Sequence, residues 1–182
     1  FQELHRHSVV LSHLAHEICQ FYNRGKSPVV GTIALLHDIG KSVVLLLRMQ
    51  NSKWALFIDM LDTARVGALL LKEWSIPPMV YECIDNQDLP EFTPPSLMDS
   101  PHRDGAAILH AAHAACSLLE GRTETLRHPF IEDFRRFLQL PGDSFRDFVE
   151  GHLMRELSGK LHTLPRHLRD LVTGSPLGNW DP

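Results

Sequence analysis

The sequence predicts an all-α protein. Apolar residues recur at alternating spacings of three and four along most of the chain, which is the period of a helix buried on one face. No segment shows the regular alternation of apolar and polar residues that marks a half-buried strand. Several proline and glycine residues stand at the ends of the periodic segments, where they start or stop helices.

Composition sets limits on the class of protein. The chain has 182 residues, 43% of them apolar and 22% charged, which is ordinary for a globular protein with a core. The net charge of −4, with both signs interspersed, argues against a nucleic-acid surface. The longest apolar run is far short of the ~18 residues of a spanning helix, and no signal peptide is visible. We therefore expect a cytoplasmic protein with no nucleic-acid or membrane partner.

The cysteines point to a reducing compartment. Cys19, Cys83 and Cys116 are scattered, odd in number and free of CxxC spacing. This usage predicts reduced intracellular thiols that pack as small apolar groups.

The first predicted helix carries one apolar stripe. Its members are Leu4, His7, Leu11, Leu14, Ile18 and Phe21. His7 lies on this stripe, whereas His5, His13 and His16 point elsewhere, so His7 is placed to meet other buried groups. Ser27 followed by Pro28 predicts the start of a second helix, with serine as N-cap, and Gly40 suits its end.

The middle of the chain continues as helices. The length of the apolar run 41–49 leaves helix and strand open, but its neighbours favour helix. Helical spacing then continues from Trp54 to Trp74, and we interpret both tryptophans as core residues. Pro77 and Pro78 open a short helix, and residues 87–104, rich in Pro, Ser and Asp, predict a long functional or mobile loop.

The C-terminal part predicts further helices on the same domain. Asp104 is expected to cap a helix over 105–120 that carries His110 and His113 one turn apart. The later helices have inward faces with the following apolar residues: Phe130, Phe134, Phe137, Leu138, Phe145, Phe148, Leu153 and Leu157. A last short helix lies near 165–172. We expect a helical core over 1–125, with C-terminal helices and a short tail over 126–182 packed on it.

Chemistry concentrates at His37 and Asp38, which stand side by side after an apolar run. Imidazole and carboxylate bind divalent metals, and neighbouring residues at a helix end can chelate one ion from the same side. The apolar approach predicts that the pair is deep, where an unpaired carboxylate is costly. A metal, Lys41, a histidine or backbone donors must therefore compensate Asp38.

The run His37-Asp38-Ile39-Gly40-Lys41 resembles the signature of the HD superfamily of metal-dependent phosphohydrolases, often written HDIGK. His7 with Ser8 upstream, and residues 66–77 downstream, resemble the HDOD branch, the HD-related output domains of bacterial signalling proteins. The resemblance covers residues 4 to about 120. It implies an HD-domain-like helical bundle, and a further helical bundle ahead of the segment matching His7, to which nothing here corresponds.

The resemblance also implies a ligand set for one metal. His7, His37 and Asp38 match the first three ligands of the family, and His113 stands where the fourth, an aspartate, aligns. A histidine there disfavours magnesium and suits Fe, Mn, Zn or Ni. Two alternatives stay open: a buried hydrogen-bonded cluster without metal, and His110 in place of His113. Trailing histidines such as His128 show no ligand spacing and predict solvated or capping roles.

Relatives with two metals carry further histidines where this chain has Thr63, Asn86 and Gln87. We therefore expect that the two-metal clamp of the active phosphohydrolases is not assembled. In HD enzymes a lysine at the position of Lys41 can contact substrate phosphate, but an ion pair with Asp38 is the favoured prediction here. No catalytic residue is assigned.

The favoured function is a non-catalytic bacterial signal-transduction output module of the HDOD type. Its partner would be a signalling protein, a ligand or an appended regulatory domain, with a homodimer left open. The alternative is a single-metal HD phosphohydrolase acting on a nucleotide or phosphoester, with Lys41 at the phosphate. A third hypothesis is a site that senses ligand or redox state and drives an appended domain.

Overall fold

The computed structural model describes residues 1–122 and 128–177, apart from the side chains of Ser100 and Pro101. All regular elements in these residues are helical, which confirms the all-α prediction. The α-helices are α1 (Gln2–Tyr22), α2 (Ser27–Leu36), α3 (Ile39–Gln50), α4 (Ala55–Ile58), α5 (Thr63–Glu73), α6 (Pro78–Asp85), α7 (Ser100–Leu119), α8 (Ile131–Phe137), α9 (Phe145–Phe148), α10 (Met154–Gly159) and α11 (Arg166–Gly174). The short 3-10 segments are η1 (Arg24–Lys26), η2 (Ser52–Trp54), η3 (Leu89–Glu91), η4 (Pro95–Leu97) and η7 (Leu161–Thr163), and η6 (Val149–Leu153) is one turn of π-helix.

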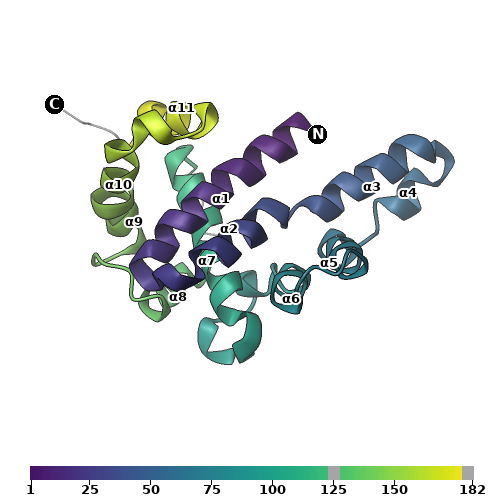
Figure 1. Cartoon of the computed structure of the whole chain (residues 1–182), viewed down its shortest axis with the longest axis horizontal. Helices are drawn as coiled ribbons and strands as arrows, with labels where there is room; N and C mark the ends of the chain where they lie inside the picture. The colour runs from purple at the N-terminus through teal and green to yellow at the C-terminus, as the bar shows by residue number, and fades with distance from the viewer. Residues whose placement is uncertain (123–127, 178–182) are drawn as a thin grey trace.

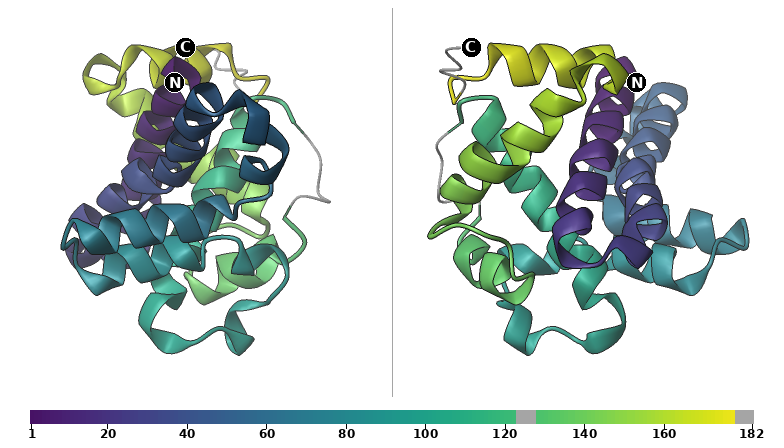
Figure 2. Two further views of the ribbon diagram at one scale, coloured as in Figure 1. Left: turned by 90° about the vertical axis from the view of Figure 1, so that its right-hand side faces the viewer. Right: turned by 60° about the vertical axis from the view of Figure 1, so that its left-hand side comes forward.

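Helices α1, α2 and α7 form the centre of the molecule (Figure 1). Helix α1 packs along α2 and against α7, because its apolar stripe faces both. Helices α3 and α4 extend away from this centre, and α5 joins α3 to α6. The C-terminal helices α8 to α11 cover the other side of α1 and α7 (Figure 2).

One buried apolar cluster runs from α1 through α7 into the C-terminal helices. The C-terminal residues predicted to face inward are deeply buried in it at Phe134, Leu138, Phe145, Phe148, Leu153 and Leu157. Cys19, Cys83 and Cys116 are free and buried, as predicted for small apolar groups. The proposed division at residue 125 lies outside the described residues.

The prediction that Gly40 ends a helix is wrong. Helix α2 ends at Leu36, His37 and Asp38 form a turn, and Gly40 lies in the first turn of α3. A Cβ atom at this position would lie 1.8 Å from the carbonyl oxygen of Thr63 and 2.7 Å from the amide nitrogen of Gly67. Glycine is therefore needed because the backbones of α3 and α5 meet here.

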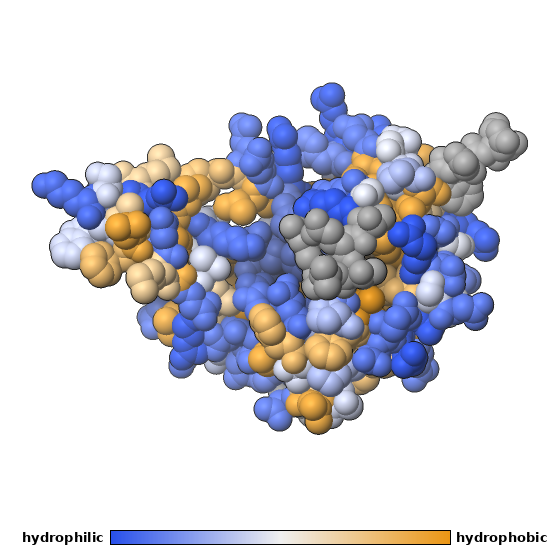
Figure 3. All heavy atoms as spheres, turned by 180° about the vertical axis from the view of Figure 1, so that it is seen from behind, coloured by the Kyte–Doolittle hydropathy of each residue, from blue (hydrophilic) through white to orange (hydrophobic). Residues whose placement is uncertain are grey.

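The prediction that Trp54 and Trp74 are core residues is also wrong. Their exposed fractions are 61% and 59%. Trp54, Leu56, Phe57 and Met60 lie on the α3–α4 arm, whose outer face has no covering element among the described residues. Figure 3 shows apolar side chains gathered over this arm, at the left of the view.

The predicted loop 87–104 is shorter than expected. It contains η3 and η4, and α7 begins at Ser100, preceded by Asp99 in an extended conformation. Asp104 therefore does not cap a helix. It lies inside α7, where its carboxylate pairs with Lys26 next to α2.

Length and composition alone would allow one segment, Arg24–Gln50, to cross a membrane. Only 39% of its most apolar window is buried, and the core helix of a globular protein passes the same test. The segment is interrupted at His37 and Asp38, so it is not one continuous apolar helix. It is weak evidence for a membrane span.

Candidate functional site

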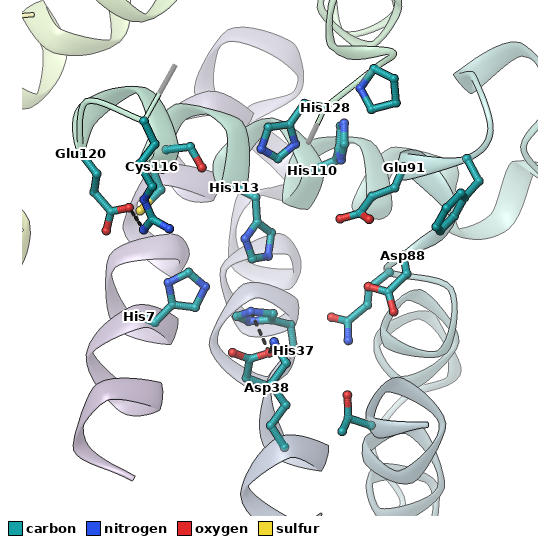
Figure 4. Close-up of a pocket in the computed structure, with 17 residues that line it drawn as sticks. His7, His37, Asp38, Asp88, Glu91, His110, His113, Cys116, Glu120 and His128 are labelled. Carbon is teal, nitrogen blue, oxygen red and sulfur yellow. Dashed lines mark hydrogen bonds and ion pairs between the residues drawn. The ribbon is translucent and has the colours of Figure 1, made fainter. Parts of the chain in front are cut away.

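Three parts of the chain bring together the His/Asp cluster, which consists of His7, His37, Asp38 and His113. His7 comes from α1, His37 and Asp38 from the turn between α2 and α3, and His113 from α7 (Figure 4). The ring centroids lie 5.5 Å apart for His7 and His37, 5.3 Å for His7 and His113, and 5.0 Å for His37 and His113. One nitrogen from each ring lies within 4.8 Å of the others. The structure thus brings together all the residues that the sequence predicts as ligands.

The tautomer of His37 is set by its own helix. Its Nδ1 lies 2.8 Å from the carbonyl oxygen of Ala34 in the last turn of α2. Nδ1–H donates to that oxygen, because a carbonyl can only accept. The lone pair of Nε2 is then left for the cluster, which is the arrangement typical of a metal-ligating histidine.

Nε2 of His37 and Oδ1 of Asp38 indicate a missing cation. The two atoms lie 3.2 Å apart, with side-chain exposures of 2% and 3%, and Nε2 has no hydrogen-bond partner in the described part of the chain. Two lone pairs at this distance repel each other unless a cation or proton lies near both. Nζ of Lys41 lies 2.7 Å from the same oxygen, which is the ion pair favoured from the sequence. Because the lysine side chain is half exposed, it offsets only part of the buried charge.

Burial keeps the three imidazoles neutral. Desolvation lowers the pKa of His7 and of His37, although the carboxylate of Asp38 raises both in part. The pKa of His113 is held well below its usual range by desolvation and by the neighbouring histidines. Neutral imidazole is the form that binds metal, so three nitrogens and one carboxylate suit a first-row divalent ion. At metal–nitrogen distances of about 2.0–2.1 Å, small side-chain rotations would close the cluster around it.

The cluster lies at one side of a pocket of about 580 Å³. Other described residues that line it are Lys41, Thr63, Gln87, Asp88, Glu91, Phe92, His110, Cys116, Ser117, Glu120, Arg122, His128 and Pro129. Together the described lining residues hold four carboxylates against two cationic side chains, so with neutral histidines they carry a net charge of −2. Glu120 is paired with Arg122. An anionic ligand would therefore need an added cation in this pocket.

The positions where two-metal relatives carry histidines are split by the structure. Thr63 and Gln87 line the pocket, whereas the Asn86 side chain donates to the carbonyl oxygen of Glu82 at 2.8 Å. Hydroxyl and amide groups are weaker ligands than imidazole for first-row metals. Within the described residues, one group of three or more histidine, cysteine or acidic side chains has metal-ligand spacing, and it is the one containing His7, His37 and His113.

His110, the alternative to His113, is not part of the His/Asp cluster. Its ring is 4% exposed and packs at centroid distances of 4.9 Å against both His128 and Phe134. His128 lies against this buried ring and lines the pocket, unlike the solvated or capping role predicted for it. Spacing could not reveal this pair, because the two histidines lie on different segments. Asp88 and Glu91, also missed as site residues, belong to the loop whose length predicts a functional segment.

Comparison with known proteins gives one match. A model of the HD domain family matches residues 4–118, a range that contains the whole His/Asp cluster. Neither the curated proteins nor the solved structures contain a significant match to the chain.

Proposed function

This chain belongs to the HD domain family, and from that membership we propose that it is a non-catalytic signalling output module of the HDOD type. It would hold one divalent cation in the His/Asp cluster and respond to a phosphorylated ligand in the adjoining pocket. The observation that carries the proposal is the buried pair of lone-pair atoms on His37 and Asp38, which faces two further neutral imidazoles. A bacterial cytoplasm, with its reduced thiols, would suit the three free cysteines.

The residues of the pocket support binding more than turnover. A divalent ion in the cluster would supply Lewis-acid polarisation and a fixed position for a phosphoryl oxygen. Lys41, held by Asp38 at the pocket wall, adds a second positive charge for the same phosphate. Thr63 and Gln87 supply no imidazole for a second ion, so charge development on a phosphoester would be poorly stabilised.

The surface of the α3–α4 arm supports the partner-binding part of the proposal. Leu56, Phe57 and Met60 are exposed by 81%, 66% and 82%. Contiguous apolar surface of this kind marks protein–protein contacts more often than chance exposure does. A signalling protein, an appended regulatory domain or a second copy of the chain would each bury it.

A single-metal phosphohydrolase is the second candidate function. It is favoured by the open pocket next to the His/Asp cluster and by the position of Lys41 on its wall. In this case the same cluster would hold the ion and Lys41 would contact the phosphate of a nucleotide or another phosphoester.

A hydrolysis assay separates the two. The purified protein, loaded in turn with Mn²⁺, Fe²⁺ and Mg²⁺, is offered p-nitrophenyl phosphate and bis(p-nitrophenyl) phosphate. We expect no turnover above that of the His37→Ala variant. Metal-dependent hydrolysis that is lost in His37→Ala and Asp38→Ala, but kept when the exposed His5 is replaced by alanine, would establish the second candidate.

A further inference from the structure

His110 is a buried polar residue that the His/Asp cluster does not use. Its ring is almost completely buried, and its Nε2 has no hydrogen-bond partner among the described residues. Burial, with a smaller contribution from His128, lowers the pKa of His110 to about 3, so the ring is neutral near pH 7. A neutral imidazole offers one N–H donor and one lone-pair acceptor. An unsatisfied polar atom in such a place is costly unless a ligand completes it.

A second unsatisfied atom belongs to the same pocket. Oε1 of Gln87 is buried without a hydrogen-bond partner in the described structure, and Gln87 and His110 both line the pocket that contains the His/Asp cluster. Asp88, the next residue, also lines it, and burial together with the charges of Asp62 and Asp38 raises the pKa of its carboxyl group. Figure 4 shows Asp88 across the gap from the cluster, and His110 beyond His113.

The charges of the two ends differ in what they accept. At the cluster, a divalent cation and Lys41 would attract phosphate. The far wall, made of His110, Gln87 and Asp88, carries acceptors and a carboxylate but no cation of its own. A second phosphate placed there would face like charge, whereas an N–H donor would satisfy the open acceptors. The pocket volume of about 580 Å³ is in the range of small-ligand sites.

We propose that His110 and Gln87, with Asp88 beside them, form a head-group subsite that selects phosphomonoesters bearing N–H donors over polyphosphates. This inference rests on the proposed function, because it assumes that phosphate occupies the cluster end of the same pocket. It names the class of ligand: one phosphate, and a polar head group with donors at the other end. His110 acts as a specificity-determining residue whether or not the ligand is turned over.

The test compares three probes on the full chain loaded with Mn²⁺, by isothermal titration calorimetry at one ionic strength. Guanosine 5′-monophosphate has the phosphate and a donor-bearing head group, ribose 5-phosphate has the phosphate alone, and guanosine 5′-triphosphate adds two phosphates. We expect the monophosphate to bind at least about tenfold tighter than ribose 5-phosphate, and tighter than the triphosphate. In His110→Leu the advantage over ribose 5-phosphate should be lost while ribose 5-phosphate itself binds within about twofold of the unmodified protein.

Two controls keep the outcome clear. His110→Gln keeps a donor and an acceptor and should retain part of the discrimination, and the Mn²⁺ content and melting temperature of each variant show that cluster and fold are intact. Equal affinities for the monophosphate and ribose 5-phosphate, or unchanged discrimination in His110→Leu, would overturn the subsite and leave the proposed function standing. Failure of every phosphate probe to bind the Mn²⁺-loaded protein would overturn both.

Discussion

Asp38 is the residue on which the cluster depends. Its carboxylate is 3% exposed and lies between Nε2 of His37 and Nζ of Lys41, so it couples the buried imidazole to the only positive charge that touches it in the described structure. The adjacency of histidine and aspartate after an apolar run predicted a deep ligand pair. The tautomer of His37 could not be predicted, because it depends on the Ala34 carbonyl at the end of α2.

Replacing Asp38 by asparagine tests its role in metal affinity. The change keeps the size of the side chain but removes the negative charge, so we expect affinity for Mn²⁺ or Zn²⁺ to fall by about tenfold or more. Competition with a chromogenic chelator measures the change. His5→Ala, on the exposed side of α1, should stay within about twofold of the unmodified protein, and equal affinity of Asp38→Asn and this control would exclude Asp38 as a ligand.

His110 should make the protein sensitive to acid. Its pKa of about 3 in the folded state lies below the usual 6.5, so the unfolded chain takes up this proton first as the pH falls. The stability contribution is therefore fully present above about pH 6.5 and is lost progressively between 6.5 and 3. Between pH 6.5 and 5 the loss is about 2 kcal/mol of unfolding free energy.

Urea unfolding of the metal-free protein at pH 7, 6 and 5 checks this dependence. His110→Leu lacks the titrating ring, so its unfolding free energy should fall less steeply over this range. The cluster histidines contribute to both proteins and cancel in the comparison. Parallel pH dependences of the two proteins would contradict the burial of a neutral His110.

At the scale of elements, the junction of α2, α3 and α5 positions the cluster. The break at His37 and Asp38 turns both side chains toward α1 and α7, and α3 then runs out against α5. Gly40 was predicted as a helix end because glycine is common just past helix C-termini. The close approach of Thr63 is a contact distant in sequence, which periodicity and local propensity do not reveal.

Gly40→Ala should therefore destabilise the fold. The new methyl group would meet the backbone oxygen of Thr63, which cannot move away as a flexible side chain could, so we expect a loss of about 1–3 kcal/mol or more. The shift of the urea midpoint measures it. Gly151→Ala is the matched control, because no heavy atom lies within 4 Å of its added Cβ and the change should be neutral or slightly stabilising. Equal midpoints for the two variants would contradict the described contact of α3 with α5.

At the scale of the whole molecule, one core holds the matched HD region and the C-terminal helices together. Phe21 of α1 meets Phe148 of α9 edge-on at a centroid distance of 5.2 Å, and Glu17 of α1 accepts from Nζ of Lys160, just after α10, at 2.8 Å. Periodicity predicted which aromatic faces turn inward in the C-terminal helices. It failed at Trp54 and Trp74, because the burial of an apolar face depends on a neighbour that the pattern does not contain.

The ion pair of Glu17 with Lys160 should contribute to this union. Lys160→Met leaves the buried carboxylate without its cation, and because the lysine is half exposed we expect a loss of about 1–2 kcal/mol. Urea unfolding measures it. Adding Glu17→Gln to Lys160→Met should restore part of the loss, since the uncompensated charge is gone. A single variant as stable as the unmodified protein would show that the pair contributes nothing to stability.

The most direct test of the account is the number of metal ions that the chain binds. Protein purified without oxygen is loaded with excess Mn²⁺, Fe²⁺ or Zn²⁺, dialysed, and analysed for metal and for protein by mass spectrometry and amino-acid analysis. The cluster of three imidazoles and one carboxylate predicts one ion per chain, lost in His37→Ala. Two ions per chain, or none with any of the three metals, would contradict it.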